Sequence, residues 1–105
     1  MRIRPLAALA ALAALFAASA ALPAFAQDAR YLAANCANCH GTEGRSVGAI
    51  PALAGIDADY FIAQMKAFKD GRRQATIMNQ LAKGYSDQQV ATLAQFFSKQ
   101  KAAGR

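Results

Sequence analysis

Both cysteines and the only histidine of the 105-residue chain fall within five consecutive positions, Cys36-Ala37-Asn38-Cys39-His40. Two thiols spaced three residues apart on one turn can add to the two vinyl groups of a single porphyrin, and the imidazole that follows can bind the iron. A thioredoxin-like redox pair would need a βαβ setting, and a zinc site would need four ligands. A plain disulfide stays open as an alternative. We therefore expect Cys36 and Cys39 to attach one haem c covalently and His40 to bind its iron.

The beginning of the chain has the pattern of a secretory signal peptide. Two arginines precede an apolar run at residues 6–22, and a small-x-small tripeptide, A-F-A, follows at 24–26. A retained membrane anchor is the alternative, although the run is at the lower limit of about 17 residues for a membrane span. We expect residues 1–26 to be removed on export to the periplasm. Residues 27–105 would then form one domain without stable membrane insertion.

This domain is small, and it is only moderately basic. A chain of this size buries about 60% of the surface that it exposes when unfolded, so it often needs a cofactor to complete its core. Without the first 26 residues, ten basic residues face six acidic ones. No basic arm or basic-aromatic stripe is present, so we expect no nucleic-acid partner. Five basic residues form a cluster in the sequence: Lys66, Lys69, Arg72, Arg73 and Lys83. The cluster could dock a partner protein or bind the haem propionates. Alternatively, it is a solvated helix face.

The remaining patterns predict an all-α fold of three main helices and loops wrapped around the haem. The helices are expected over residues 28–35, 57–70 and 86–102. Their expected N-caps are Asp28, Asp57 and Ser86, the last in a capping box with Gln89. Between the helices we expect a glycine-punctuated loop over residues 41–55 and an irregular segment over 71–84 with a helical turn near 77–82. No segment alternates convincingly enough to be a strand.

The second iron ligand is expected to be a methionine, because the chain has no other histidine. Met65 lies on an apolar helical stripe with Phe61 and Phe68, where methionine usually fills the core. Met78 lies in the irregular segment, and we expect it to be the ligand. Alternatively, Met78 is another core residue and the iron is five-coordinate.

Residues 27–105 resemble a class I cytochrome c of the small bacterial branch. The matching stretches are C-A-N-C-H-G from residue 36, I-P-A-L-A-G at 50–55, Y-F-I-A-Q-M-K-A-F-K-D-G-R from 60, Met78, and G-Y-S-D-Q-Q at 84–89. The resemblance implies that the Pro51 carbonyl orients His40. It also implies that the first and last helices cross, which would pack Tyr31 and Leu32 near Leu93 and Phe97. The chain departs from the family at Ile56, where glutamine is common.

A narrower resemblance concerns the cytochrome subunit of flavocytochrome c sulfide dehydrogenase. It rests on G-R-S-V-G at 44–48 and A-T-I-M-N-Q-L-A-K-G-Y-S-D at 75–87. It implies a periplasmic electron carrier, not itself an enzyme, that accepts electrons from an FAD-containing sulfide dehydrogenase subunit. The alternatives are a freestanding electron shuttle, an open-site haem enzyme or gas sensor, and a thiol-disulfide exchange protein.

Overall fold

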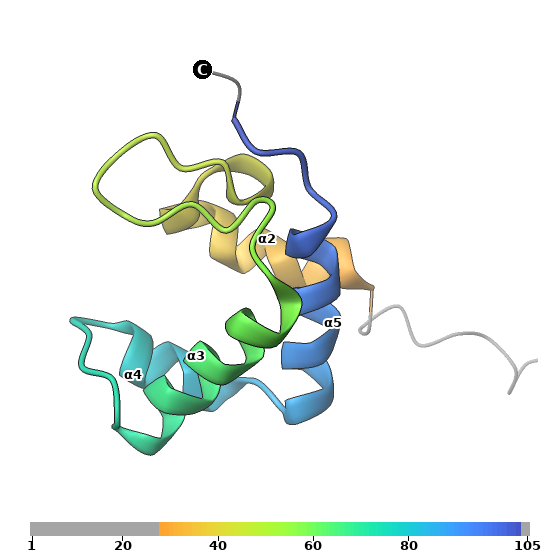
Figure 1. Cartoon of the computed structure of the whole chain (residues 1–105). Coiled ribbons are helices and arrows are strands. Elements are labelled where there is room, and N and C mark those ends of the chain that lie inside the picture. The colour runs from red at the N-terminus through yellow and green to blue at the C-terminus, as the bar shows by residue number, and fades with distance from the viewer. Residues whose placement is uncertain (1–27, 104–105) are drawn as a thin grey trace, which may run out of the picture.

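Helices and turns make up the whole architecture of residues 28–103, the part of the chain that the computed structural model describes (Figure 1). The long helices are α2 (Ala29–His40), α3 (Ala58–Asp70) and α5 (Asp87–Ser98). The short elements are η2 (Thr42–Gly44), α4 (Met78–Leu81) and η3 (Ala82–Gly84). The expected all-α class with three main helices is thus confirmed. The predicted signal peptide, residues 1–26, lies outside the described residues.

Each long helix begins at the cap that the sequence predicts. Asp28 caps α2 through its carboxylate, and the Asp57 carboxylate accepts a hydrogen bond from the Tyr60 amide at 2.8 Å. At α5 the Ser86 hydroxyl accepts from the Gln89 amide at 3.1 Å, and the Gln89 side chain accepts from the Ser86 amide at 2.9 Å. These bonds satisfy amide groups that have no partner inside the helix. Local side-chain chemistry therefore sets where the helices start.

The first helix is longer than expected. The sequence pattern predicts that it ends at residue 35, but α2 continues through the whole C-x-x-C-H motif to His40. It stops at Gly41, whose φ of 82° leaves the helical region and whose amide donates to the Ala37 carbonyl at 3.1 Å. Because residues three apart lie on one face of a helix, the continuation places Cys36 and Cys39 on the same side.

The last helix is shorter than expected. It ends at Ser98 rather than near residue 102. The Phe97 carbonyl accepts hydrogen bonds from the amides of Gly55, at 2.9 Å, and Gln100, at 3.1 Å. The chain after Ser98 therefore turns along the 41–55 loop, and Arg45 binds the Lys101 carbonyl through its Nε at 2.7 Å.

The core lies where α2, α3 and α5 meet. Its nine buried apolar residues among those described are Leu32, Ala33, Phe61, Met65, Ala82, Val90, Leu93, Ala94 and Phe97. Phe97 is fully buried, and its ring lies 5.9 Å from that of Phe61. Leu32 joins this cluster, as the expected helix crossing requires. Tyr31 does not, since the residue is 70% exposed; adjacent positions along a helix are turned from one another by about 100°.

None of the helices among residues 28–103 has the length and apolar character needed to cross a membrane.

Candidate haem-binding site

The two cysteines lie in the last two turns of α2, and neither forms a disulfide within the described part of the chain. Cys36 is half-buried against the core, whereas Cys39 is exposed. Burial raises the pKa of the Cys36 thiol, and a backbone hydrogen bond partly opposes that effect. A raised pKa keeps this thiol protonated, so it is not poised as a thiolate nucleophile of the kind that exchanges disulfides.

The orientation of His40 is set by the backbone of the 41–55 loop at Pro51. Its Nδ1 lies 2.6 Å from the carbonyl oxygen of Pro51. A carbonyl can only accept a hydrogen bond, so Nδ1 carries the proton and Nε2 keeps a lone pair for a metal. A metal-binding histidine is usually fixed in this way by its second nitrogen. This is the contact that the family resemblance implies for His40 and Pro51.

Gly44 closes the loop that brings Pro51 back over His40. The Gly44 carbonyl accepts hydrogen bonds from the amides of Leu53, at 2.8 Å, and Ala54, at 3.1 Å. Its φ is 77°, and a Cβ at this position would lie only 2.9 Å from atoms of Leu53, Ala54 and Phe97. Only glycine fits this left-handed, closely packed position without strain. The path of the 41–55 loop therefore depends on one residue without a side chain.

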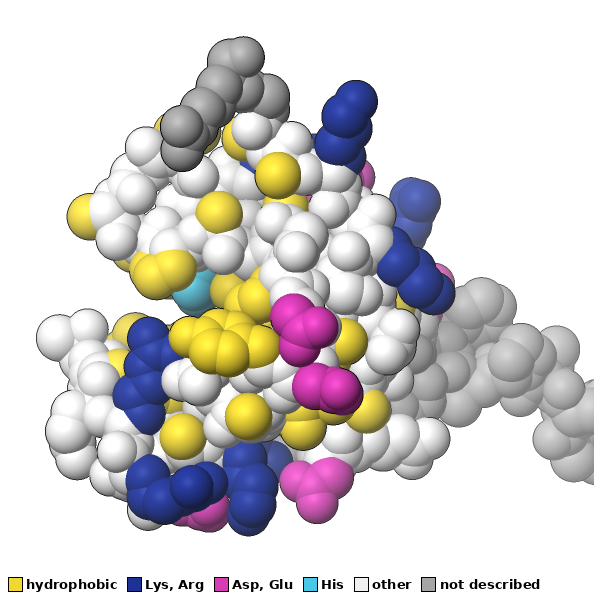
Figure 2. All heavy atoms as spheres, in the orientation of Figure 1, with side chains coloured by type: hydrophobic (Ala, Val, Ile, Leu, Met, Phe, Trp, Pro, Cys, Tyr) yellow, Lys and Arg dark blue, Asp and Glu magenta, His cyan; other side chains and the backbone are white. Residues whose placement is uncertain are grey.

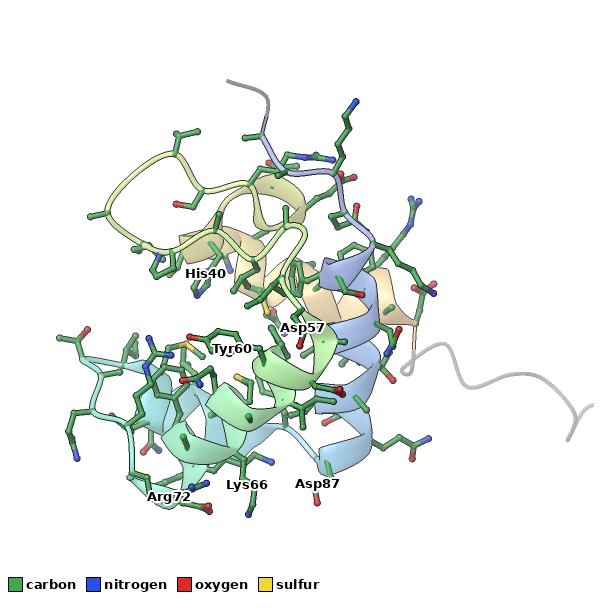
Figure 3. The ribbon with its side chains drawn as sticks, in the orientation of Figure 1. His40, Asp57, Tyr60, Lys66, Arg72 and Asp87 are labelled. Carbon is green, nitrogen blue, oxygen red and sulfur yellow. The ribbon has the colours of Figure 1, made fainter. Side chains whose placement is uncertain are left out.

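A hollow separates α2 and the 41–55 loop from α3 and α4, and Figure 2 shows the histidine at its inner end among hydrophobic side chains. In Figure 3, His40 and Tyr60 face this hollow from opposite sides. Most of the large exposed apolar residues lie on the segments that border the hollow. These residues are Val47, Ile50, Tyr60, Ile77 and Leu81. Apolar surface gathered in this way is what a flat apolar ligand would cover. Together with two thiols and an oriented imidazole, the residues present fit a haem.

The two methionines differ in their surroundings. Met65 is 6% exposed and belongs to the core, as the sequence predicts. Met78 is half-buried and only packs against the core from its edge. It is the first residue of α4, which lies across from the 41–55 loop in Figure 1. The position of Met78 is therefore compatible with a ligand, and that of Met65 is not.

Much of the basic cluster is engaged by the protein itself. Lys66 and Arg72 both bind the Asp70 carboxylate, at 3.3 and 3.2 Å, and Lys69 donates to the backbone carbonyl of Tyr85. Hydrogen bonding to Lys66, with the positive charges of Lys66 and Arg72, lowers the pKa of Asp70. Figure 3 shows Lys66 and Arg72 on the side of α3 away from the hollow. Arg73 donates to the Gln64 side chain and lies over the Phe68 ring, so contacts within the protein favour a structural role for four of the five residues.

Sequence reasoning missed two residues near the site. Tyr60 was not singled out, although it begins a stretch that matches the family. Asn79 was not singled out either, yet its side chain forms three hydrogen bonds to the backbone around α4. The signals in the sequence are its place directly after Met78 and its inclusion in the 75–87 stretch of the narrower resemblance, and neither points to these three contacts.

Three curated relatives are 35% to 39% identical to parts of this chain. The chain is 38% identical over 62 residues to the thiosulfate dehydrogenase electron acceptor of Thiomonas intermedia, covering 59% of this chain and 29% of that protein. It is 35% identical over 56 residues to the cytochrome subunit of sulfide dehydrogenase of Chlorobaculum tepidum, covering 53% and 51%. It is 39% identical over 64 residues to cytochrome c-554(548) of Halomonas halodenitrificans, covering 57% and 77%. The chain thus spans 29% of the first relative and about half of the second.

The family comparison covers nearly the whole described chain. The model of the family described as cytochrome c matches residues 27–101, which include the C-x-x-C-H motif, the 41–55 loop and all the helices described here. Members of this family bind haem c through cysteine thiols and carry electrons. The oriented imidazole, the two free thiols and the apolar hollow agree with that chemistry. This chain therefore belongs to the cytochrome c family.

Proposed function

We propose that Cys36 and Cys39 would attach the haem, and that Nε2 of His40 and the sulfur of Met78 would be the two protein ligands of its iron. The 2.6 Å contact between His40 Nδ1 and the Pro51 carbonyl carries this assignment, because it leaves Nε2 free and fixes the plane of the ring. Pro51 thus acts through its backbone carbonyl. Met78 is supported by its place at the edge of the hollow and by the burial of Met65 in the core.

When bound, the haem supplies a one-electron centre whose iron alternates between the ferric and ferrous states. The work of the chain is to keep both ligands in place and to exclude water. The Pro51 carbonyl holds the His40 imidazole in one orientation, and a methionine ligand raises the reduction potential. Apolar side chains around the hollow lower the local dielectric, which also affects the potential.

A pair of matched variants of the holoprotein tests the ligand assignment. The oxidised wild type should show the long-wavelength charge-transfer band of methionine bound to ferric iron. Met78→Leu should abolish this band, whereas Met65→Leu, a volume-conserving change in the core, should keep it. A wild type without the band would refute ligation by Met78 and favour the open-site haem enzyme or gas sensor.

We further propose that the electron donor is an FAD-containing sulfide dehydrogenase subunit, and that the exchange takes place in the periplasm. The names of two relatives, a sulfide dehydrogenase cytochrome subunit and a thiosulfate dehydrogenase electron acceptor, support a dehydrogenase of sulfur compounds as donor. A freestanding electron shuttle is the second candidate. The relative of which this chain covers 77% supports it, because that protein is named only as a cytochrome.

Purification of the full chain from its host's periplasm, with haem and flavin measured together, separates these functions. The sulfide dehydrogenase role predicts that FAD co-purifies and that sulfide produces the ferrous haem spectrum. The cytochrome purified alone, mixed with the same sulfide, is the control for direct chemical reduction. Reduction that is equally fast without the flavoprotein, or a preparation that contains no flavin, would contradict this donor and favour the shuttle.

A further inference from the structure

The side chain of Asn79 ties the start of α4 to the segment before it. Its Oδ1 accepts a hydrogen bond from the Ala75 amide at 2.8 Å. Its Nδ2 donates to the Phe68 carbonyl at 3.0 Å and to the Arg73 carbonyl at 2.7 Å. One half-buried side chain thus uses both ends of its amide on three backbone groups.

The three partners also fix how the amide is turned. A backbone amide can only donate and a carbonyl can only accept, so Oδ1 must face Ala75 and Nδ2 must face Phe68 and Arg73. A flipped side chain would lose all three bonds. No other common side chain of this length offers one acceptor and two donors in this geometry. The contact is therefore specific to asparagine.

These bonds connect α4, which is too short to be stable by itself, to the end of α3 and the segment between them. Phe68 lies in the last turn of α3, eleven residues before Asn79. Helix α4 has four residues and no side-chain N-cap, and so short a helix does not form without outside contacts. The Arg73 side chain lies back on α3, with its guanidinium 4.8 Å from the centre of the Phe68 ring. The segment before α4 is thereby held against α3, and Asn79 joins α4 to it.

We propose that Asn79 is a positioning residue that holds Met78 at the haem iron. This inference rests on the proposed ligand, because Met78 is the residue directly before Asn79 and shares its helical turn. Replacement of Met78 by an outside ligand needs room at the iron, and movement of the start of α4 away from the end of α3 would provide that room. That movement breaks the bonds of Asn79 to Phe68, Arg73 and Ala75. The asparagine therefore opposes replacement of Met78 by other ligands.

The test measures how readily imidazole displaces Met78 from the ferric holoprotein. Asn79→Ala removes all three bonds and should raise the imidazole binding constant roughly tenfold or more. Asn79→Asp keeps the acceptor for the Ala75 amide but loses both donors, so it should give a smaller increase. The loss of the methionine charge-transfer band during the titration reports the event at the iron directly.

Gln80→Ala is the matched control. Gln80 is the next residue of the same short helix, it is exposed, and its side chain forms no hydrogen bond within residues 28–103. Its truncation should leave the imidazole constant within about twofold of wild type. If Asn79→Ala does not yield holoprotein, Asn79→Asp is compared with Gln80→Ala in its place.

The outcomes separate this inference from the proposed function. If wild type shows the methionine band, Met78→Leu abolishes it, and the Asn79 variants bind imidazole like Gln80→Ala, then Met78 is the ligand but Asn79 does not position it. If wild type lacks the band, the proposed ligand fails, and the inference fails with it. A selective increase in the Asn79 variants supports both.

Discussion

At the scale of single residues, the site depends on positions that carry little chemistry of their own. Gly44 has no side chain, but its carbonyl binds two amides of the returning loop and its Cα faces Phe97 closely. Through the loop it places Pro51, and through Pro51 it orients His40. A residue outside the C-x-x-C-H motif thus helps to decide which nitrogen of His40 carries the proton.

Gly44→Ala should destabilise the holoprotein by about 2–4 kcal/mol. The added Cβ would meet three atoms at 2.9 Å, and a residue with a side chain is strained at a φ of 77°. Denaturant unfolding of the holoprotein measures the loss. Gly48→Ala, in the same loop, is the control, since a Cβ there would meet nothing within 4 Å. Equal effects of the two substitutions would contradict the role assigned to Gly44.

At the scale of elements, the end of α3 is stabilised by charge. Asp70 is an unfavourable residue for the last turn, where the helix dipole is negative, and Lys66 and Arg72 compensate by binding its carboxylate. These partners lower the pKa of Asp70 from its ordinary value of 3.8. Below 3.8 the unfolded chain therefore binds a proton more readily than the folded protein does.

The contribution of Asp70 to stability should be complete above pH 3.8 and should fall as the pH drops through the lower pKa of the folded protein. We expect Asp70→Asn to make the free energy of unfolding less dependent on pH in this acid range. Urea unfolding at several pH values, at low and high salt, measures the effect, which salt should weaken because the carboxylate is exposed. Asp59→Asn, in the first turn of α3, is the control. An unchanged pH dependence in Asp70→Asn would contradict this role.

The beginnings of the helices could be predicted from the sequence, because a cap is a contact between neighbours. Asp28, Asp57 and Ser86 each bind an amide two or three residues further along. Such pairs are visible as residue types at fixed spacing. The core role of Met65 was predictable for the same reason, since its helical stripe is local.

The ends of the helices and the links across the site could not be predicted in this way. Helix α5 ends at Ser98, where the Phe97 carbonyl binds the distant Gly55 amide as well as the amide of Gln100. Asn79 reaches Phe68, eleven residues away, and no spacing rule marks such a pair. The hydrogen bond between His40 and Pro51 also joins residues eleven positions apart in the sequence, and only the family resemblance suggested it. Contacts made by the folded chain leave no local pattern in the sequence.

At the scale of the whole molecule, the core is small. Nine buried apolar residues among those described hold three helices together, while large apolar side chains such as Val47 and Ile77 stay exposed. A domain of this size is only marginally stable without a cofactor. The haem is therefore expected to complete the core as well as to carry the electron.

The Cys36→Ala/Cys39→Ala double variant, which cannot attach haem, should lose its cooperative thermal transition. The reason is that the hollow and its apolar borders would face water. Far-UV circular dichroism during heating measures this, with the holoprotein as reference. A double variant whose thermal transition is as cooperative as that of the holoprotein, with the same midpoint temperature, would show that the helices need no cofactor.

The contact between His40 and Pro51 has a consequence for how such a protein tolerates mutation. The acceptor is a main-chain oxygen, and every amino acid at position 51 would supply the same atom. A substitution at that codon therefore cannot remove the oxygen that orients the imidazole. It can only change how rigid the backbone is at position 51. The orientation of His40 depends on the path of the loop backbone. A substitution at Gly44, which distorts that path, is therefore expected to disturb His40 more than a substitution at Pro51 itself.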